Sequence, residues 1–339
     1  MGVDISNILV KHQTSLKENS GLTLSIDGYN ILYQFLSSIR QPDGTPLMDS
    51  SGRVTSHLSG IFYRTINLME AGIKPVFVFD GKPSELKNRT IEARIMMKEK
   101  AKAELVEARA EGNEERVRSL SARTSHLTRE MVQEARTLLD YMGVPNLVAP
   151  SEGEAQASMM SKKGLVDGVV SQDYDCLMFG AKRVFRNFTF FGRRKVPGRN
   201  MYINVVPEYI DLNENLEKLQ ITHDQLIQIG ILVGTDFNSG LYKVGAKTAL
   251  NLMRKHGDIY KILETKEANI DNLEKIIDLF RNPPYNEDVD VQLQKPDTSK
   301  IIDFLCSEHD FALNRIENYI GTLQDIQQKQ SQKSLDSFF

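Results

Sequence analysis

Three apolar runs in this chain, each of a length suited to a buried strand, end in aspartate residues. The runs lead into Asp27, into Asp80, and into the pair Asp173 and Asp175. Aspartate is unfavourable inside a strand, so these residues mark the points where the strands end. The carboxyl ends of parallel strands lie along one edge of an open α/β sheet, where ligands bind. The pattern therefore predicts a parallel sheet with four carboxylates gathered at that edge.

Two glutamates extend this acidic set. Glu152 and Glu154 open an expected helix shortly before the third run. Ser151 is a good N-cap residue three positions before Glu154, so a capping box alone would explain Ser151 and Glu154 without any function. Carboxylates gathered this closely cannot all stay ionised unaided, because each like charge raises the pKa of its neighbours. Divalent cations remove this conflict when they bind.

The donor set indicates which cations these would be. The expected ligands are all oxygen atoms, with no His or Cys, which suits Mg²⁺ or Mn²⁺ rather than zinc. Two such ions about 4 Å apart are typical of phosphodiester hydrolysis. A single aspartate at the end of a strand is more often a turn or cap residue. Three such strands and a glutamate pair favour a metal centre.

Composition limits the class of protein only loosely. The chain has 339 residues, 40% hydrophobic and 26% charged, which fits one large globular domain or two small ones. Cys176 and Cys306 form no CxxC motif, so we expect reduced thiols. Apolar runs of transmembrane length and a signal peptide are both lacking, so no membrane partner is expected. The net charge of −3 is uninformative, because an acidic pocket offsets basic surfaces elsewhere.

A long charged segment follows the second run. Residues from about 84 to 142 show little strand signal and predict two long helices separated near Gly112. Lys87, Arg94 and Lys98 lie within about 40° of one direction on the first of these helices. Such a stripe, about 16 Å long, is either a solvated face or a surface for a phosphate backbone. Its position beside an acidic site favours the second interpretation.

The segment from Thr222 to Leu250 predicts another nucleic-acid contact. A helix at 223–233 ends just before Asp236, a seventh candidate carboxylate. A glycine turn and a second helix follow, as in a helix-hairpin-helix, where amides at a helix N-terminus bind a DNA phosphate. Glycine turns between helices are also common without this function.

Three further segments give weaker predictions. Residues 3–19 fit a short amphipathic helix, and residues 182–195 fit a hairpin of strands whose basic and aromatic side chains could stack on bases. The polar stretch 324–337 predicts disorder. One side of a final helical turn would present an apolar plug for a partner, formed by Gln332, Leu335, Phe338 and Phe339.

Five short motifs carry a resemblance to a known family over essentially the whole chain. The motifs are Ile26-Asp27, residues 77–83 (FVFDGKP), 150–155 (PSEGEA), 171–175 (SQDYD) and 234–236 (GTD). In their order and context, they make the chain resemble a flap endonuclease of the structure-specific 5′ nuclease superfamily, most closely the archaeal members.

The resemblance implies a DNA nuclease with a defined set of site residues. Two Mg²⁺ ions, which Mn²⁺ can replace, would be held by Asp27, Asp80, Glu152, Glu154, Asp173, Asp175 and Asp236. The implied catalytic residues are Lys87, Arg94 and Asp173. The implied DNA contacts are Gly2, Tyr33, Arg40, Thr55, Arg64, Lys87, Arg94, Gly245, Lys247, Phe311 and Arg315. The terminal plug of Gln332, Leu335, Phe338 and Phe339 matches the motif that binds a sliding clamp of the proliferating cell nuclear antigen type.

The hairpin departs from the family pattern. Where the family usually reads Gly-Ile-Gly-Pro-Lys, residues 243–247 read Lys-Val-Gly-Ala-Lys. Relatives build a K⁺ site in this hairpin. Because Lys243 and Ala246 stand in place of Gly and Pro, the sequence does not decide whether this chain binds K⁺ there. His309 likewise stands where some members carry Lys.

These observations together predict an α/β fold with a mostly parallel twisted sheet flanked by helices, a PIN-like nuclease core. Residues 1–325 would form one nuclease domain with a helical arch inserted at about 82–135 and a helix-hairpin-helix region at about 222–258. Residues 326–339 would form a disordered, clamp-binding tail. We expect a monomer in the cytoplasm, associated with the nucleoid in an archaeon, or in the nucleus of a eukaryote.

The expected activity is the removal of 5′ flaps from DNA in replication and repair, by two-metal-ion hydrolysis, with an associated 5′–3′ exonuclease activity. Two alternatives remain open at this point. A PIN-type ribonuclease shares the acidic site but has no need of an arch, a hairpin and a clamp motif together. A non-catalytic DNA scaffold bound to the clamp would be expected to lack some of the seven acids, and all are present.

Overall fold

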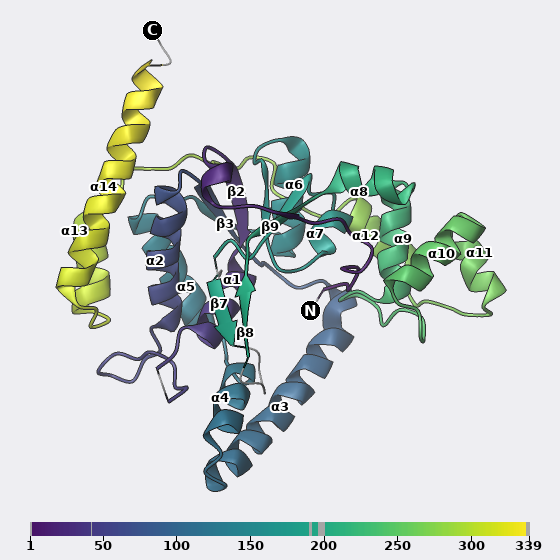
Figure 1. Ribbon diagram of the computed structural model, residues 1–339, viewed down its shortest axis with the longest axis horizontal. Helices are drawn as coiled ribbons and strands as arrows, with labels where there is room; N and C mark the ends of the chain where they lie inside the picture. Colours follow the sequence, from purple (N-terminus) through teal and green to yellow (C-terminus); the bar gives the residue numbers. More distant parts are fainter. Residues whose placement is uncertain (1, 42, 190–191, 196–200, 337–339) are drawn as a thin grey trace.

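The strands of the protein form one main sheet and a small ribbon (Figure 1). A computed structural model describes residues 2–41, 43–189, 192–195 and 201–336. The strands of the main sheet are β1 (His12–Gln13), β2 (Thr23–Asp27), β3 (Lys74–Phe79), β4 (Asn146–Val148), β5 (Gly168–Val170), β6 (Arg183–Arg186) and β9 (Glu208–Asp211). The ribbon pairs β7 (Gly192–Lys195) with β8 (Tyr202–Val205).

The order of strands in the main sheet is β1-β9-β6-β5-β2-β3-β4. The strands from β6 to β4 pair in parallel, while β9 and β1 pair antiparallel at one edge. The expected mostly parallel sheet is therefore confirmed. All of the parallel strands have their carboxyl ends at the same edge, which is the edge where the acidic residues follow.

Helices cover both faces of this sheet. The helices of the body are α1 (Gly28–Ser38), α2 (Ser56–Glu70), α5 (Arg129–Tyr141), α6 (Gly153–Lys163), α7 (Asp175–Met178), α8 (Leu212–Leu219), α9 (His223–Val233), α10 (Ala246–His256), α11 (Ile259–Thr265), α12 (Leu273–Arg281), α13 (Thr298–Ile302) and α14 (Leu313–Asp336). Short helical turns lie at η1 (Lys17–Asn19), η2 (Glu85–Lys87) and η3 (Asp303–Ser307).

Successive side chains of β3 point to opposite faces of the sheet and so belong to two separate hydrophobic cores. Phe77 and Phe79 are buried in a core with α1, α2 and α5, while Val76 and Val78 are buried in a second core with α6, α7 and α9. This alternation follows from the two-residue period of a strand. Each large apolar side chain buried in this way stabilises the fold by about 1.5–3 kcal/mol. The sheet edge with the acidic residues thus lies on a support packed on both sides.

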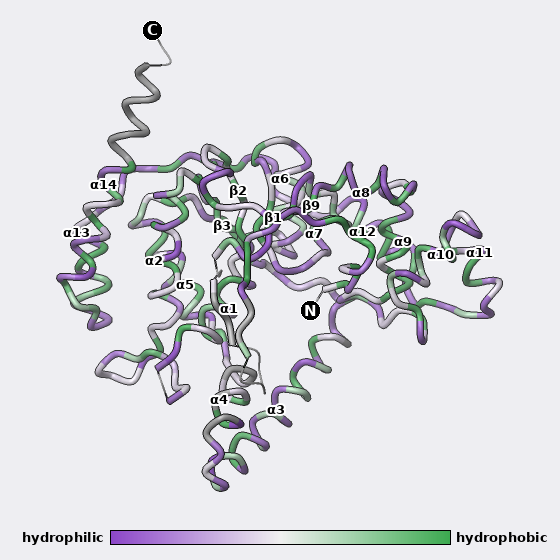
Figure 2. Tube along the Cα trace, viewed as in Figure 1, coloured by the Kyte–Doolittle hydropathy of each residue, from purple (hydrophilic) through white to green (hydrophobic). Residues whose placement is uncertain are grey.

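A helical arch projects from this body (Figure 1). It is made of α3 (Asn88–Ala110) and α4 (Glu114–Arg123), with Gly112 at φ +66° in the turn between them. Among the described side chains, a small core joins the two helices: Ala101, Ala108 and Leu120, with Leu105 and Val117 against them. Figure 2 shows hydrophilic stretches along α3, in contrast to the hydrophobic strands of the sheet. The arch therefore depends on its contacts at the base for its position.

The structure corrects two predictions of helix extent. The second charged helix was expected to continue to Met142, but it breaks at 124–128 into α4 and α5, because Thr128 caps α5 by accepting a hydrogen bond from the amide of Met131 (3.2 Å). The amphipathic helix expected at 3–19 is also wrong. Residues 3–19 contain a turn at 6–8, the strand β1 and the short turn η1, but no α-helix; Val3 and Ile5 are buried, and β1 is paired to β9.

The hairpin expected at 182–195 is wrong as well. β6 lies inside the main sheet between β5 and β9, because both Val184 and Phe185 are buried there, one in each core. β7 pairs instead with β8.

The C-terminal segment also differs from its prediction. α14 packs beside α2 and continues as a helix to Asp336, away from the body, where disorder was expected from 326 (Figure 1). The Gln- and Lys-rich sequence has the propensity for such a helix. Gln332 and Leu335 lie on this helix, and Phe338 and Phe339 lie outside the described residues. Among the described residues, no helix has the length and apolar character needed to cross a membrane.

Candidate functional site

The carboxyl edge of the sheet brings together the aspartates that follow β2, β3 and β5. Asp27 ends β2, where it caps α1 by accepting a hydrogen bond from the amide of Asn30 (3.0 Å). Asp80 follows β3 and accepts a hydrogen bond from the amide of Gly153 (2.6 Å). Because β2, β3 and β5 are parallel neighbours, the four aspartates predicted for this edge lie along it.

The glutamates come from the beginning of α6. Glu152 is its N-cap residue, and no side chain makes a capping hydrogen bond there. The capping-box explanation of Ser151 and Glu154 is therefore wrong, and Glu154 is left for another role. Gly153 permits the close approach to β3, since a Cβ atom on it would lie 2.8 Å from Oδ1 of Asp80.

The electrostatics of this edge are those of crowded, buried acids. Burial, with the charge of Asp80 as the next cause, raises the pKa of Asp27 from 3.8 to about 8. Burial likewise raises the pKa of Asp175 to about 7, with Asp173 contributing. The pKa values of Asp80 and Glu154 are raised in the same way, by burial first and by neighbouring carboxylates. The raised pKa values show that these carboxylates have too little positive charge near them to stay ionised together.

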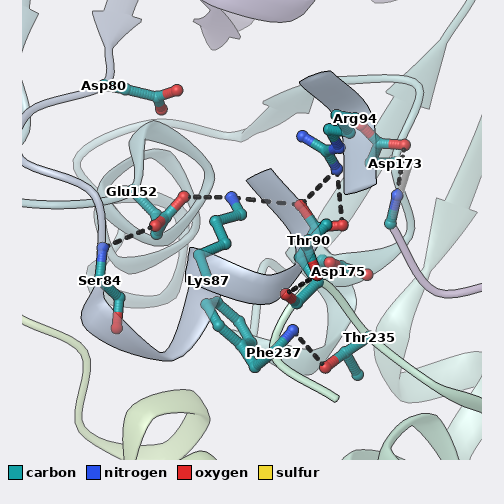
Figure 3. Close-up of polar contacts among 12 residues, drawn as sticks. Asp80, Ser84, Lys87, Thr90, Arg94, Glu152, Asp173, Asp175, Thr235 and Phe237 are labelled. Carbon is teal, nitrogen blue, oxygen red and sulfur yellow. Dashed lines mark hydrogen bonds and ion pairs between the residues drawn. The ribbon is translucent and has the colours of Figure 1, made fainter. Parts of the chain in front are cut away.

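Two cations from the arch supply part of that charge (Figure 3). Nζ of Lys87 contacts a carboxylate oxygen of Glu152 and lies 3.2 Å from Oδ2 of Asp236. One guanidinium nitrogen of Arg94 lies 2.7 Å from each carboxylate oxygen of Asp236. Burial acts to raise the pKa of Asp236, but neighbouring positive charges, Lys87 foremost and Arg94 among them, more than offset this effect and the pKa is lowered.

The fit of this site to metal ions rests on its donor chemistry. In the described part of the chain, no three His, Cys, Asp or Glu side chains stand close enough together to hold an ion as they are placed. Two of the predicted ligands, Glu152 and Asp236, are paired with the arch cations instead. The acids at this edge nevertheless present only oxygen atoms, and several have raised pKa values, so the set fits hard divalent cations.

The N-terminal segment reaches the same edge. The main-chain nitrogen of Gly2 lies 3.2 Å from Oδ1 of Asp173, and the amide of Val3 donates to Oδ1 of Asp175 (2.6 Å). A Cβ atom on Gly2 would lie 2.7 Å from Oδ1 of Asp175, so no larger residue fits without a shift. This agrees with the predicted place of Gly2 at the site.

Several neighbours of the acids were not singled out from the sequence. The side-chain amide of Asn30 donates to Oδ2 of Asp173 (3.0 Å), a role that its place one turn after Asp27 could have suggested. Tyr174, between two acids, receives hydrogen bonds on its hydroxyl from Lys11 (2.8 Å) and Arg186. Thr90 donates to the main-chain carbonyl of Asp236 (2.7 Å), and its spacing from Lys87 and Arg94 was the available signal.

The residues predicted to contact DNA near α1 and α2 differ from one another in exposure and in contacts. Tyr33 is 43% exposed, with Nζ of Lys98 5.8 Å from the centre of its ring. Arg40 donates to the carbonyl groups of Gly44 (2.7 Å) and Ser121 (3.0 Å), and the second contact links the segment after α1 to α4 of the arch. Thr55 is buried at the start of α2, and Arg64 lies half-buried on that helix.

The remaining predicted contacts lie near the C-terminal helices. Phe311 packs partly against the core beside η3, and Arg315 is exposed on α14. His309 is buried, with Nδ1 3.8 Å from Asp49, rather than placed as an exposed cation.

In the hairpin between α9 and α10, no side chain caps the N-terminus of α10. Gly245 is the N-cap residue of α10 with no capping side chain, and Lys247 is exposed in the first turn. Lys243 adopts a left-handed conformation (φ +60°), which glycine accommodates more readily than a residue with a side chain. The neighbouring Tyr242 is 87% exposed.

Comparison with known families defines the class of protein. The XPG N-terminal domain matches residues 1–101, and the XPG I-region matches residues 143–236. Both matched segments contribute acids to the edge described above. The structure of the catalytic core of Rad2 in complex with DNA substrate, 21% identical, has the same fold with a TM-score of 0.71 over 95% of this chain and all of that one. The fold and the site thus define an XPG-type nuclease.

Relatives of known identity narrow the class further. Flap endonuclease 1 of Picrophilus torridus is 56% identical over 339 residues, the whole of both chains. Flap endonuclease 1 of Archaeoglobus fulgidus is 46% identical, again over the whole of both chains. The structure of flap endonuclease-1 from Methanococcus jannaschii, 40% identical, superposes with a TM-score of 0.76 over 96% of this chain and 98% of that one. This chain belongs to the flap endonuclease family, and to its archaeal type.

Proposed function

We propose that this protein cuts DNA where a single-stranded 5′ flap leaves the duplex, and that it also removes nucleotides from 5′ ends. The observation that carries this proposal is the pairing of Lys87 and Arg94, at the base of the arch, with carboxylates at the sheet edge. Membership of the flap endonuclease family supports the choice of substrate.

We propose that the carboxylates hold two Mg²⁺ ions, for which Mn²⁺ can substitute. Their chemical contribution when bound is to activate water and to neutralise charge at the phosphodiester. The proposed ligands, directly or through water, are Asp27, Asp80, Glu152, Glu154, Asp173, Asp175 and Asp236. The raised pKa values of Asp27, Glu154 and Asp175 support this role, because cations replace the protons that these acids otherwise retain.

The arch cations have a proposed role on the substrate. Lys87, at the end of η2, and Arg94, on α3, lie on one side of this helical segment within reach of the edge, so they bind the scissile phosphate and stabilise the charge that develops there. Asp173 is oriented by Asn30 and by the nitrogen of Gly2. The exposed ring of Tyr33 supplies a surface on which a base next to the scissile bond stacks.

Selectivity for structure follows from the remaining surfaces. The arch admits a single strand, and the open N-terminus of α10 with Gly245 and Lys247 binds a phosphate of the duplex. A K⁺ ion bound at this hairpin, with Lys243 in place, is a further part of the proposal. The 3′ side of the junction is assigned to Arg40, Thr55, Arg64, Phe311 and Arg315.

The tail has a proposed partner. Gln332, Leu335, Phe338 and Phe339 would bind a sliding clamp of the proliferating cell nuclear antigen type. The proposal includes a monomeric enzyme acting in DNA replication and repair, in the cytoplasm and at the nucleoid of an archaeal cell.

The test is cleavage of an end-labelled double-flap DNA, with a matched RNA hairpin in parallel. We expect cutting at the flap junction with Mg²⁺ and none with EDTA. Asp173→Ala should abolish cutting and retain flap binding, while the exposed Asp325→Ala on α14 should cut normally. Flap binding without any cutting by the wild type would favour a scaffold. Preferred cutting of the RNA would favour a ribonuclease of the PIN type.

A further inference from the structure

Three side chains at the base of the arch engage a single residue. Lys87, Thr90 and Arg94 are separated by three and four positions and therefore share one face of the helical segment that starts α3. Lys87 and Arg94 pair with the carboxylate of Asp236. Thr90 instead donates its hydroxyl hydrogen to the main-chain carbonyl of Asp236, at 2.7 Å.

The turn that carries Asp236 is well fixed to the body. Oγ1 of Thr235 accepts a hydrogen bond from the amide of Phe237 (3.0 Å), and the side-chain amide of Asn238 donates to the carbonyl of Ile231 (2.7 Å). The ring of Phe237 packs edge-on against Phe280, with 5.5 Å between their centres. Since this turn is fixed, its contacts with α3 position the arch relative to the site, and not the reverse.

The ion pairs of Lys87 and Arg94 cannot hold the arch to the sheet edge once metal ions and DNA are bound. In the proposed function, Lys87 and Arg94 bind the scissile phosphate, and the carboxylates of Glu152 and Asp236 bind metal ions. Both events draw on the same charges that now form the ion pairs between α3 and the sheet edge. The hydrogen bond of Thr90 joins a neutral hydroxyl to a main-chain carbonyl, so it does not use the charges on which metal binding and phosphate binding draw.

The direction of this hydrogen bond is itself informative. Threonine hydroxyls commonly bond to main-chain groups a few residues away in their own segment. The hydroxyl of Thr90 instead crosses to a turn 146 residues away in the sequence. Such a bond ties two separate elements together rather than satisfying a local donor.

We infer that Thr90 is a positioning residue: its hydrogen bond to the carbonyl of Asp236 keeps the base of the arch over the acidic edge after Lys87 and Arg94 have turned to the phosphate. This inference rests on the proposed function for the roles of the two cations. The bond itself exists independently of that function, which allows a separate test.

The test compares Thr90→Val, which keeps the shape and removes the donor, with Thr90→Ser, which keeps the hydroxyl. Thr322→Val on α14 is the matched control, because it removes a helical threonine hydroxyl that bonds within its own helix, to Asn318. On a double-flap DNA with saturating Mg²⁺, we expect Thr90→Val to lower kcat by about 3- to 10-fold with KM unchanged. Thr90→Ser should restore kcat, and Thr322→Val should not alter it.

A second readout needs neither metal nor DNA. Hydrogen exchange of the amides at 88–98 should become faster in Thr90→Val, with exchange in α2 and α9 unchanged. If the wild type fails to cut flaps while this exchange effect is present, the proposed function fails and the positioning contact stands. Unchanged exchange at 88–98 would overturn the inference. A kcat loss that Thr90→Ser does not restore would also overturn it, as would faster exchange throughout the protein.

Discussion

Arg94 holds Asp236 through one guanidinium nitrogen that lies 2.7 Å from each of the two carboxylate oxygens. This contact joins the arch helix α3 to the turn after α9, and Lys87 adds a second link to the same carboxylate at 3.2 Å. A carboxylate held in this way is less available to a metal ion. The cations proposed to act on the substrate therefore also compete with metal binding in the absence of DNA.

Arg94→Met should separate these two effects. With one of its cationic partners removed and Lys87 still present, Asp236 should bind metal more readily, so we expect a few-fold higher Mg²⁺ affinity in calorimetry of the DNA-free protein. Flap cleavage should fall by about 10²- to 10³-fold, the usual cost of removing a group that stabilises developing charge. Arg281→Met, which breaks a surface pair with Asp224, is the control and should change neither value. A weaker Mg²⁺ affinity in Arg94→Met would contradict the competition.

The stability of the metal-free protein should depend on pH. The pKa of Asp27 is raised by burial from 3.8 to about 8, so the folded state holds a proton that the unfolded state releases between about pH 4 and pH 8. Stability is then present at low pH and is lost as pH rises through this window, by about 1.4 kcal/mol per pH unit for one proton. Thermal unfolding in EDTA at pH 6 and pH 8.5 should show the higher Tm at pH 6.

Asp27→Asn should reduce this pH dependence, because the substituted amide does not titrate. Asp325→Asn, at an exposed position, should leave it unchanged. Addition of Mg²⁺ should raise Tm more at pH 8.5 than at pH 6, since the ion replaces the lost protons. A Tm in EDTA that rises from pH 6 to pH 8.5 would refute the protonated cluster.

Gly2→Ala should disturb the site despite the small change. A Cβ atom at this position would lie 2.7 Å from Oδ1 of Asp175, so the N-terminal segment or the carboxylate must shift. We expect lower Mg²⁺ affinity and slower cleavage, measured by calorimetry and flap assays. Gly321→Ala on α14 is the matched control, because nothing lies within 4 Å of its Cβ position. That variant should cut normally and gain about 0.5–1 kcal/mol of helix stability. Full activity of Gly2→Ala would argue against a close N-terminal contact.

Lys243→Gly should raise the stability of the protein and lower its affinity for DNA. The left-handed conformation of Lys243 (φ +60°) is strained for a side chain, and glycine relieves about 1 kcal/mol of that strain. We expect a slightly higher Tm, weaker duplex binding, and a salt dependence of binding reduced by about one phosphate contact. Gln220→Gly relieves the same kind of strain at φ +55° without removing a charge, so DNA binding should be unchanged in that control. Equal DNA binding by Lys243→Gly and wild type would exclude a phosphate contact by Lys243.

Local sequence patterns were sufficient for the sheet, because aspartates that close apolar runs mark strand ends whatever the rest of the fold does. They were insufficient for the N-terminal segment, where the spacing of apolar residues over 3–19 predicted a helix. The segment instead buries Val3 and Ile5 in the core and pairs β1 with β9. The same holds for β6, whose buried Val184 and Phe185 belong inside the sheet rather than in a hairpin.

The sequence by itself determined the parallel sheet, the acidic edge, the two-helix arch and the family to which the chain belongs, because each depends on residue types at short spacing. Only the tertiary structure decided which residues meet at the site. Arg94 and Lys87 pair with Asp236, Thr90 donates to the main-chain carbonyl of Asp236, and the nitrogen of Gly2 lies close to Asp173. The physical reason is that these contacts join segments more than a hundred residues apart. Packing on both faces of the sheet, and not local propensity, brings such segments together.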